Sequence, residues 1–359
     1  QGTTFVSYGP ETNAAIVHPD GKTRDGQLRK GSRLVLKRGT VQLELPSGVL
    51  ALVEGPATVE GKGRNALRLE HGRAWFQVPN GAEGFTCSTA ALEIVDLGTE
   101  FGVIAAPGEQ EEVHVLKGRV RVHPHGRPGQ FRELEAGDAL AWSGDDSTFP
   151  AGGTGFVTTL PQKFVVFSDD FSDADEAALH GKHPDTGAGP WLVTEGNPLI
   201  LDEALDSAGS PHKAFAPIDT SRLDEVNNVF LLTIDTGEPD SRAFHSHGWA
   251  GVSLFADSEE QIFAGDSFGH GNCWSFDPPG AKDDIIPTNP PLRGKQVVTL
   301  RYDFRTGLIE MFQGHDSRGR ALATTTIAPG LHFDQVRVGN GEGGDLALRL
   351  LRALSLIHI

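Results

Sequence analysis

The sequence predicts an all-β protein of two domains, on the strength of three observations. Glycine and proline are abundant, with 45 and 22 of the 359 residues, and frequent turn residues favour short elements over long helices. Short segments of alternating apolar and polar residues recur, and none in the first half keeps a helical period over three turns. A Gly-rich, polar run at residues 143–155 interrupts this pattern, as a domain boundary does.

The first half predicts a series of half-buried strands. Residues 40–45 place Val41, Leu43 and Leu45 on one face and polar side chains on the other. Further strands are expected at 49–53, ending at the Gly-Pro pair 55–56, at 66–70 and 73–78 on either side of a His-Gly turn at 71–72, and at 84–89, 92–97, 100–104, 112–116 and 119–123. Regularly spaced short strands indicate a stack that is solenoid-like or sandwich-like.

The second half predicts longer strands separated by larger loops. They are expected at 163–167, 229–235, 250–255, 261–264, 296–303, 308–313, 321–327, 335–339 and 346–359, with a short helix at 173–180. Strands and excursions of this size are typical of a jelly-roll β-sandwich. We therefore expect domains at residues 1–145 and 161–359, joined by a flexible linker at 146–160.

Composition and charge exclude several classes of protein. The net charge is −17, and an acidic surface repels both nucleic-acid phosphates and anionic membranes. No apolar run reaches the roughly 18–20 residues that a membrane helix needs. The two cysteines, Cys87 and Cys273, cannot build a disulfide framework or a thiolate zinc site, so we expect both to be free and buried. Because the chain opens on Gln1, we expect a processed amino terminus.

An ordered series of motifs in the first half resembles the FecR family of periplasmic regulators. The matching segments are 39–48, 54–57, 67–78, 84–89, 96–103, 113–120 and 134–138. Any one of them is weak, but seven in order over about 100 residues are specific. The resemblance implies sensing or scaffolding outside the cytoplasm, without chemistry. Typical members hold a sigma factor through an amino-terminal cytoplasmic segment and a membrane helix, and this chain shows neither.

The second half resembles a concanavalin A-like, LamG-type jelly roll, as found after FecR-like modules in envelope proteins of planctomycete and verrucomicrobial type. The matching segments are 168–171, 248–255, 263–266 and 333–339. The resemblance implies a periplasmic, cell-surface or extracellular protein that presents the jelly roll to a glycan or a protein partner. Three alternatives stay open: a FecR-type signal transducer, a self-assembling homo-oligomer of an envelope layer or filament, and a glycoside hydrolase.

The motif at residues 96–102 is the most tempting site in the first half. It carries two carboxylates four residues apart, which is a spacing compatible with acid–base chemistry. A structural role explains it better, because Gly98 and Gly102 permit sharp turns or close strand approach. Asp96 and Thr99 are side chains that cap turns well. We interpret Asp96, Gly98, Thr99 and Gly102 as residues that hold the fold.

Glycosidase chemistry requires a pair of carboxylates flanking the sugar bond. Jelly-roll glucanases, which the second half resembles, carry these carboxylates as Glu-X-Asp-X-X-Glu on one strand, and no segment matches that pattern. The sequence therefore predicts a protein that is not an enzyme.

Two further sites in the second half are hypotheses. Trp249 and Trp274, with polar Asp266, His270 and Asn272 nearby, are the residue types of a sugar-binding face, where rings stack and polar groups orient hydroxyls.

Acidic residues at the start of the second domain predict a calcium site, because carboxylates are the ligands calcium prefers. We expect Asp169 and Asp170 to supply them, and the LamG-type resemblance implies that calcium is common in this class of sandwich. The alternating pair His245 and His247, with His270, is a weaker candidate for a transition metal.

Overall fold

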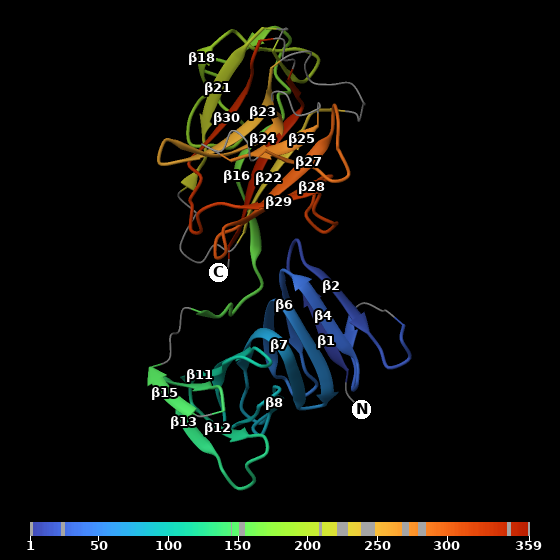
Figure 1. The fold of residues 1–359 in the computed structure, drawn as a ribbon, viewed down its shortest axis with the longest axis vertical. Coiled ribbons are helices and arrows are strands. Elements are labelled where there is room, and N and C mark those ends of the chain that lie inside the picture. The colour runs from blue at the N-terminus through green and yellow to red at the C-terminus, as the bar shows by residue number, and fades with distance from the viewer. Residues whose placement is uncertain are drawn as a thin grey trace. The chain divides into compact units, whose positions relative to one another are not determined.

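The computed structural model describes residues 3–22, 26–144, 146–150, 155–207, 210–220, 229–237, 248–267, 273–278, 285–342 and 346–357 (Figure 1). The elements that the chain forms in these ranges are β-strands, which confirms the predicted all-β class. The chain forms two compact units, Gln1–Gln162 and Lys163–Ile357. No helix in the described part of the chain is long and apolar enough to cross a membrane.

The first unit contains one 15-stranded sheet, blue to green in Figure 1. Its strands are β1 (Thr4–Tyr8), β2 (Asn13–Val17), β3 (Gln27–Leu28), β4 (Arg33–Arg38), β5 (Thr40–Glu44), β6 (Leu50–Gly63), β7 (Ala66–Gln77), β8 (Thr86–Ser88), β9 (Leu92–Asp96), β10 (Glu100–Ala105), β11 (Glu111–Lys117), β12 (Arg119–Pro124), β13 (Arg132–Glu135), β14 (Asp138–Trp142) and β15 (Asp146–Pro150). The main path of the sheet runs β13-β12-β9-β8-β7-β10-β11-β14-β15, and β1–β6 join it through the pairing of β6 with β7.

The two long strands of this sheet depart from the sequence prediction. A strand end is predicted at 55–56 and a turn at 71–72, and both predictions are wrong, because β6 and β7 continue through these positions. The β6–β7 register shifts between Glu54 and Thr58, so the extra residues form a bulge rather than a turn. Gly72 has a positive φ of 104° and packs against the backbone at Pro56 and Ala57. The glycines therefore bend long strands where a local pattern suggests that strands end.

The core of the first unit is aromatic at its centre. Phe76 stacks on Phe101 with 5.0 Å between ring centroids and packs at 5.2 Å against Phe85. These rings belong to the continuous cluster of buried apolar side chains that the alternation in β5, β7 and β10 supplies. Cys87 lies in the same cluster, and both it and Cys273 are free and buried, as predicted.

The end of the first unit includes residues predicted to be a linker. β15 pairs antiparallel with β14 along its whole length. Residues 155–162 also belong to the first unit rather than lying between the two. The polar, Gly-rich composition of 143–155 gave no sign of this pairing, because a strand at the end of a sheet is defined by its neighbour.

The second unit is a sandwich of two large antiparallel sheets with a small third sheet. The six-stranded sheet has the order β16 (Gln162–Asp169), β32 (Leu350–Ile357), β22 (Val229–Asp235), β27 (Val297–Asp303), β28 (Leu308–Gln313) and β29 (Ala323–Thr326). The seven-stranded sheet has the order β18 (Leu192–Glu195), β21 (His212–Pro217), β30 (Gln335–Asn340), β23 (Ala250–Ala256), β24 (Glu259–Asp266), β25 (Trp274–Asp277) and β26 (Ile286–Pro287). The small sheet is β17 (Ala177–Ala178), β19 (Leu199–Ile200), β20 (Leu205–Asp206) and β31 (Ala347–Leu348).

One apolar core lies between the two large sheets. Leu232 of β22 and Leu300 of β27 belong to the same buried cluster as Val252 of β23 and Val338 of β30. Alternate residues of each strand therefore point inward, as a two-sheet sandwich requires. The helix predicted at 173–180 is wrong, because this segment consists of turns and the short strand β17.

Candidate functional sites

The carboxylate of Asp169, at the end of β16, is fully buried and makes four hydrogen bonds. Lys182 Nζ donates to both carboxylate oxygens, at 2.7 and 2.9 Å. Trp191 Nε1 donates to Oδ2 at 2.7 Å, and the backbone N–H of Phe171 donates to Oδ1 at 3.0 Å. A second carboxylate, from Asp173, lies 3.0 Å from the same ammonium group. Asp169 is therefore the centre of a paired and satisfied network beneath the surface of the second unit.

Burial is the largest influence on the pKa of both members of this ion pair. It raises the pKa of Asp169 above its usual value, although Lys182 and Trp191 act in the opposite direction. Burial also acts to lower the pKa of Lys182, but its hydrogen bonds to Asp169 and Asp173 outweigh it and the pKa is raised. The ammonium group is therefore charged throughout the neutral range, and it neutralises a buried carboxylate.

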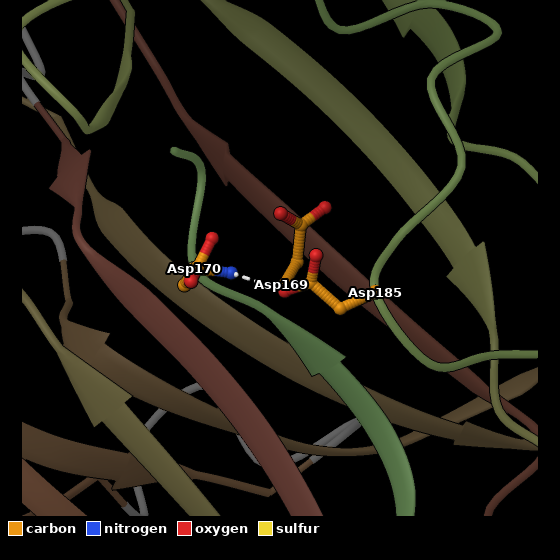
Figure 2. A group of neighbouring side chains, drawn as sticks. All are labelled: Asp169, Asp170 and Asp185. Carbon is orange, nitrogen blue, oxygen red and sulfur yellow. Dashed lines mark hydrogen bonds between the residues drawn. The ribbon is translucent and has the colours of Figure 1, made fainter. Parts of the chain in front are cut away.

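Asp169, Asp170 and Asp185 form a cluster of three carboxylates in which the potential ligand atoms lie within 4.8 Å of one another (Figure 2). Asp170 and Asp185 are exposed, and the backbone N–H of Asp170 donates to Asp185 Oδ2 at 3.0 Å. The proximity of Asp169 and Asp170 was predicted from sequence, whereas Asp185, fifteen residues further on, was not. Only the fold brings it near, beside the bridge that joins Ser168 to Thr186.

The donor set does not fit a calcium ion. Calcium takes six to eight oxygen ligands, and one of the three carboxylates here already holds an ammonium group at 2.7 Å. A cation at Asp169 would have to displace Lys182 or accept its positive charge as a close neighbour. We therefore assign the cluster a structural role.

The corner at residues 96–99 has the structural geometry that its sequence suggests. Asp96 is fully buried, its Oδ2 accepts the Gly98 N–H at 2.8 Å, and its Oδ1 accepts the Thr99 hydroxyl. Gly98 has a φ of 97°, and its carbonyl packs against Gly118. Burial raises the pKa of Asp96 to about 6, against the lowering by these hydrogen bonds.

Gly102 serves a different purpose from Gly98. It lies in the middle of β10, where its neighbours across the sheet are Trp75 and His114. A β-carbon at Gly102 would collide with the ring of Phe156, which fills the space that a side chain would take. The absence of a side chain at Gly102 therefore leaves room for the Phe156 ring to pack against β10.

Two of the residues predicted to bind sugar lie in the interior. Asp266 pairs across the sheet with both Ala250 and Trp274, and directly paired residues point to the same face. Ala250 and Trp274 belong to the core, and both Asp266 and Trp274 are buried. The indole N–H of Trp274 donates to the carbonyl of Gly294 at 3.0 Å. A fully buried ring offers no surface on which a sugar can stack.

Trp249 lies on the opposite face of the same sheet, half-buried. Its ring packs edge-on against Phe263, with centroids 5.8 Å apart. The guanidinium of Arg337 lies 5.5 Å from the Trp249 ring and 5.5 Å from the Phe255 ring, and it donates to Glu260 Oε1 at 2.7 Å. Sequence reasoning missed Arg337, because β23, β24 and β30 had to be aligned before these groups met.

Four further residues belong to the predicted sugar-binding face or to the predicted transition-metal site. His270 and Asn272, together with His245 and His247, lie outside the described residues.

A cavity of about 290 Å³ in the first unit was also missed by sequence reasoning. It lies where β12, β13 and β14 come together, and its lining residues are Pro124, Arg127, Gly129, Gln130, Phe131, Arg132 and Trp142. The guanidinium of Arg127 is 4.9 Å from the centre of the Trp142 ring and donates to the Gly144 carbonyl at 2.5 Å. The arginine and aromatic residues at 121–132 were the sequence signal available for this cavity. Their spacing follows no regular period, so the sequence does not indicate that they lie together.

Residues 14–121 match the family model described as FecR protein. The matched range begins in β2 and ends in β12, so it lies entirely within the first unit. This agrees with the resemblance drawn from the ordered motifs, and this part of the first unit is similar to FecR proteins. No curated protein sequence matches the chain significantly.

Three solved structures are similar to parts of the chain. A candidate anti-sigma factor from Parabacteroides distasonis ATCC 8503 has 18% identity and a TM-score of 0.30 over 34% of this chain and 61% of that one. The CBM2 module of the evolved Dit protein of Lactobacillus casei BL23 phage J-1 has 11% identity and a TM-score of 0.34 over 55% and 98%. A glycosyl hydrolase family protein from Mycobacterium fortuitum has 10% identity and a TM-score of 0.29 over 53% and 99%.

The chain spans about three fifths of the length of the Parabacteroides protein. The low TM-scores mean that none of these likenesses assigns a fold or a function to this chain.

Proposed function

We propose that this protein is the extracytoplasmic part of a FecR-type signal transducer, the periplasmic portion of an anti-sigma regulator. The observation that carries the proposal is the family match over residues 14–121. That match coincides with a structural unit of its own, whose sheet and core run through the whole range. A transducer of this type receives a signal from one protein partner and responds by changing its action on a second partner.

The proposed role is non-enzymatic. Asp96, which the sequence offered for acid–base chemistry, is engaged with its own turn, and the buried Asp169 is engaged with Lys182 and Trp191. A general acid or base must reach a substrate proton, and neither group is exposed. We propose that the sandwich of the second unit is a second interaction module, of the concanavalin A-like, LamG type.

Signal transduction is favoured over presentation of a glycan, which the sequence also suggested. The supporting feature for the glycan role was an aromatic and polar face, and Trp274 and Asp266 are buried in the core. The family match, by contrast, concerns a regulator.

Measuring transcript levels in the producing cell, with and without the gene, tests the proposal. We expect deletion of the gene to change the transcript levels of a discrete set of genes that share one promoter type, because an anti-sigma regulator acts through one sigma factor. Complementation with the wild-type gene should restore these levels. A deletion strain with altered envelope integrity but no promoter-specific change would support a scaffold instead and would overturn the signalling role.

A further inference from the structure

Lys182 and Asp169 form their ion pair in apolar surroundings inside the second unit. The side chain of Asp169 is fully buried, and that of Lys182 is only 10% exposed. Phe171 and Trp191 are fully buried as well, and the Lys182 ammonium lies 5.8 Å from the centre of the Phe171 ring. Burial penalises both charges of such a pair, so it favours the neutral form, in which an amine lies beside a carboxylic acid.

The amine and the carboxyl group are placed where they can react with each other. Lys182 Nζ lies 2.7 Å from Oδ1 and 2.9 Å from Oδ2 of Asp169, so it is also close to the carboxyl carbon Cγ between them. Well-oriented groups held at contact distance react with an effective concentration of about 10⁵–10⁸ M. Exclusion of water from the buried carboxyl group opposes the reverse reaction, which is hydrolysis.

Two neighbouring side chains supply the other groups that amide formation needs. Asp173 Oδ2 lies 3.0 Å from Lys182 Nζ, where it can accept a proton from the amine. Trp191 Nε1 donates to Asp169 Oδ2 at 2.7 Å, which stabilises the negative charge that develops on this oxygen when Cγ is attacked. Because Asp173 is 43% exposed, water can take over its role, so loss of Asp173 should slow the reaction without preventing it.

We propose that Lys182 and Asp169 become joined by an intramolecular isopeptide bond, which the folded chain forms without another enzyme. One proton passes from Nζ to Oδ1 and gives the neutral pair. The Nζ lone pair then attacks Cγ, and the C–N bond forms. A second proton leaves Nζ through Asp173 and reaches Oδ1, and the Cγ–Oδ1 bond breaks to release one water molecule. The product is an amide whose oxygen is Oδ2, and Asp173 returns to its carboxylate form.

The ion pair is the form that precedes this reaction. The hydrogen bonds to Asp169 and Asp173 raise the pKa of Lys182, so the neutral pair is the minor form. A minor form is sufficient, because each molecule that reacts is withdrawn from the equilibrium as a buried amide. The inference goes beyond the proposed function, since a transducer can signal with or without this bond.

A second ion pair of the same unit has the same spacing in a different environment. Lys213 Nζ lies 2.7 Å from Glu195 Oε2, but the two side chains are 40% and 47% exposed. Water stabilises both charges there, so we expect no amide between them. Lys213 therefore offers a matched control for Lys182.

Mass spectrometry of the intact, denatured full chain tests the proposal. We expect the purified protein to be lighter than the mass of its sequence by one water molecule. Lys182→Met should have the full mass of its sequence, whereas Lys213→Met should keep the loss of water. A wild-type protein of full mass would overturn the proposal, and so would a loss of water that persists in Lys182→Met.

Trypsin digestion locates the bond. Trypsin cleaves after a lysine with a free amine but not after one whose amine is part of an amide. The unlinked chain therefore gives the peptide 164–182, whereas the linked chain gives 164–213, lighter by one water molecule. Recovery of 164–182 as the sole product of this region would overturn the assignment to Lys182.

Substitutions of Asp169 test the chemistry at its carboxyl carbon. In Asp169→Asn the same attack releases ammonia instead of water, so the linked variant should have the same mass as linked wild type. Asp169→Ala has no carbon to attack and should keep the full mass of its sequence. Circular dichroism melting checks that each variant is folded. A folded Asp169→Asn chain of full mass, or a loss of water in Asp169→Ala, would overturn the proposed attack on Cγ.

Discussion

The ring of Phe156 lies against β10 where Gly102 leaves the place of a side chain open. Arg73 of β7 places its guanidinium 5.1 Å from the centre of that ring, and His114 of β11 meets it edge-on at 5.4 Å. The ring is thus held by three neighbouring strands of the first unit. One residue further on, the N–H of Val157 donates to Glu54 Oε1 at 3.1 Å.

Gly102→Ala should destabilise the first unit by about 1–3 kcal/mol, because a methyl group must displace the Phe156 ring. The measurement is the free energy of unfolding in urea. The double variant Gly102→Ala, Phe156→Ala should lose less than the sum of the two single variants, since the clash disappears with the ring.

The matched control for this prediction is Gly319→Ala, where no atom lies within 4 Å of the added β-carbon. It should leave the free energy of unfolding nearly unchanged. Strict additivity of Gly102→Ala and Phe156→Ala would contradict the contact between the two residues.

Asp96 makes the stability of the first unit depend on pH. Burial raises the pKa of this carboxyl to about 6 in the folded state, whereas an unfolded aspartate titrates near 3.9. The folded state therefore favours the protonated form, and its advantage is complete below about pH 4 and is lost as pH rises to about 6. Asp96→Asn removes the titration, so it should gain stability relative to wild type as pH rises through this window.

The measurement is the difference in free energy of unfolding between wild type and Asp96→Asn, taken from pH 4 to pH 8. Other titrating groups act on both proteins and cancel in the difference. A difference that stays constant over the whole range would show that the Asp96 carboxyl does not have a raised pKa.

The sequence predicted the fold class well because the signal for a strand is local. Alternation over residues 40–45 identified β5 and its buried Val41 and Leu43. The boundaries of strands were predicted less well, since Gly72 inside β7 looks the same in sequence as a glycine that ends a strand. Whether a glycine bends a strand or ends it depends on the backbone it packs against, here that of Pro56 and Ala57.

The same contrast between local and distant contacts separates the structural sites that the sequence predicts from those that it does not. The corner at Asp96 and Thr99 was predictable, because its hydrogen bonds join residues two and three apart. Glu111 was not predictable, although it is as buried and accepts the Ala90 and Ala91 N–H groups at 3.2 and 3.3 Å. Its partners lie about twenty residues away, and nothing in the sequence near Glu111 indicates which backbone groups it will meet.

Asp169→Ala should cost about 3 kcal/mol of stability in the second unit. The change leaves the Lys182 ammonium and the Trp191 indole N–H without their buried acceptor, and breaking one side of a buried pair is costly. Urea unfolding followed by tryptophan fluorescence measures the loss.

Asp173→Ala is the matched control, because it removes the other carboxylate at Lys182, and that carboxylate is 43% exposed. We expect it to change the free energy of unfolding by less than about 1 kcal/mol. A loss as large as that of Asp169→Ala would show that the exposed pair, not the buried network, stabilises this end of β16.

Calcium should leave the melting temperature of the wild-type protein unchanged, because the Lys182 ammonium lies against Asp169 where a cation would compete. Lys182→Met removes that charge and keeps an apolar stem of similar length beside the Phe171 ring. The three carboxylates of Asp169, Asp170 and Asp185 then lack their counter-ion and lie within 4.8 Å of one another. Millimolar calcium should therefore raise the melting temperature of Lys182→Met but not that of wild type. The measurement is differential scanning calorimetry with calcium and with EDTA, using magnesium as the control ion. A calcium-dependent rise in the wild type would mean that the cluster accepts the ion despite Lys182, and its structural assignment would be wrong.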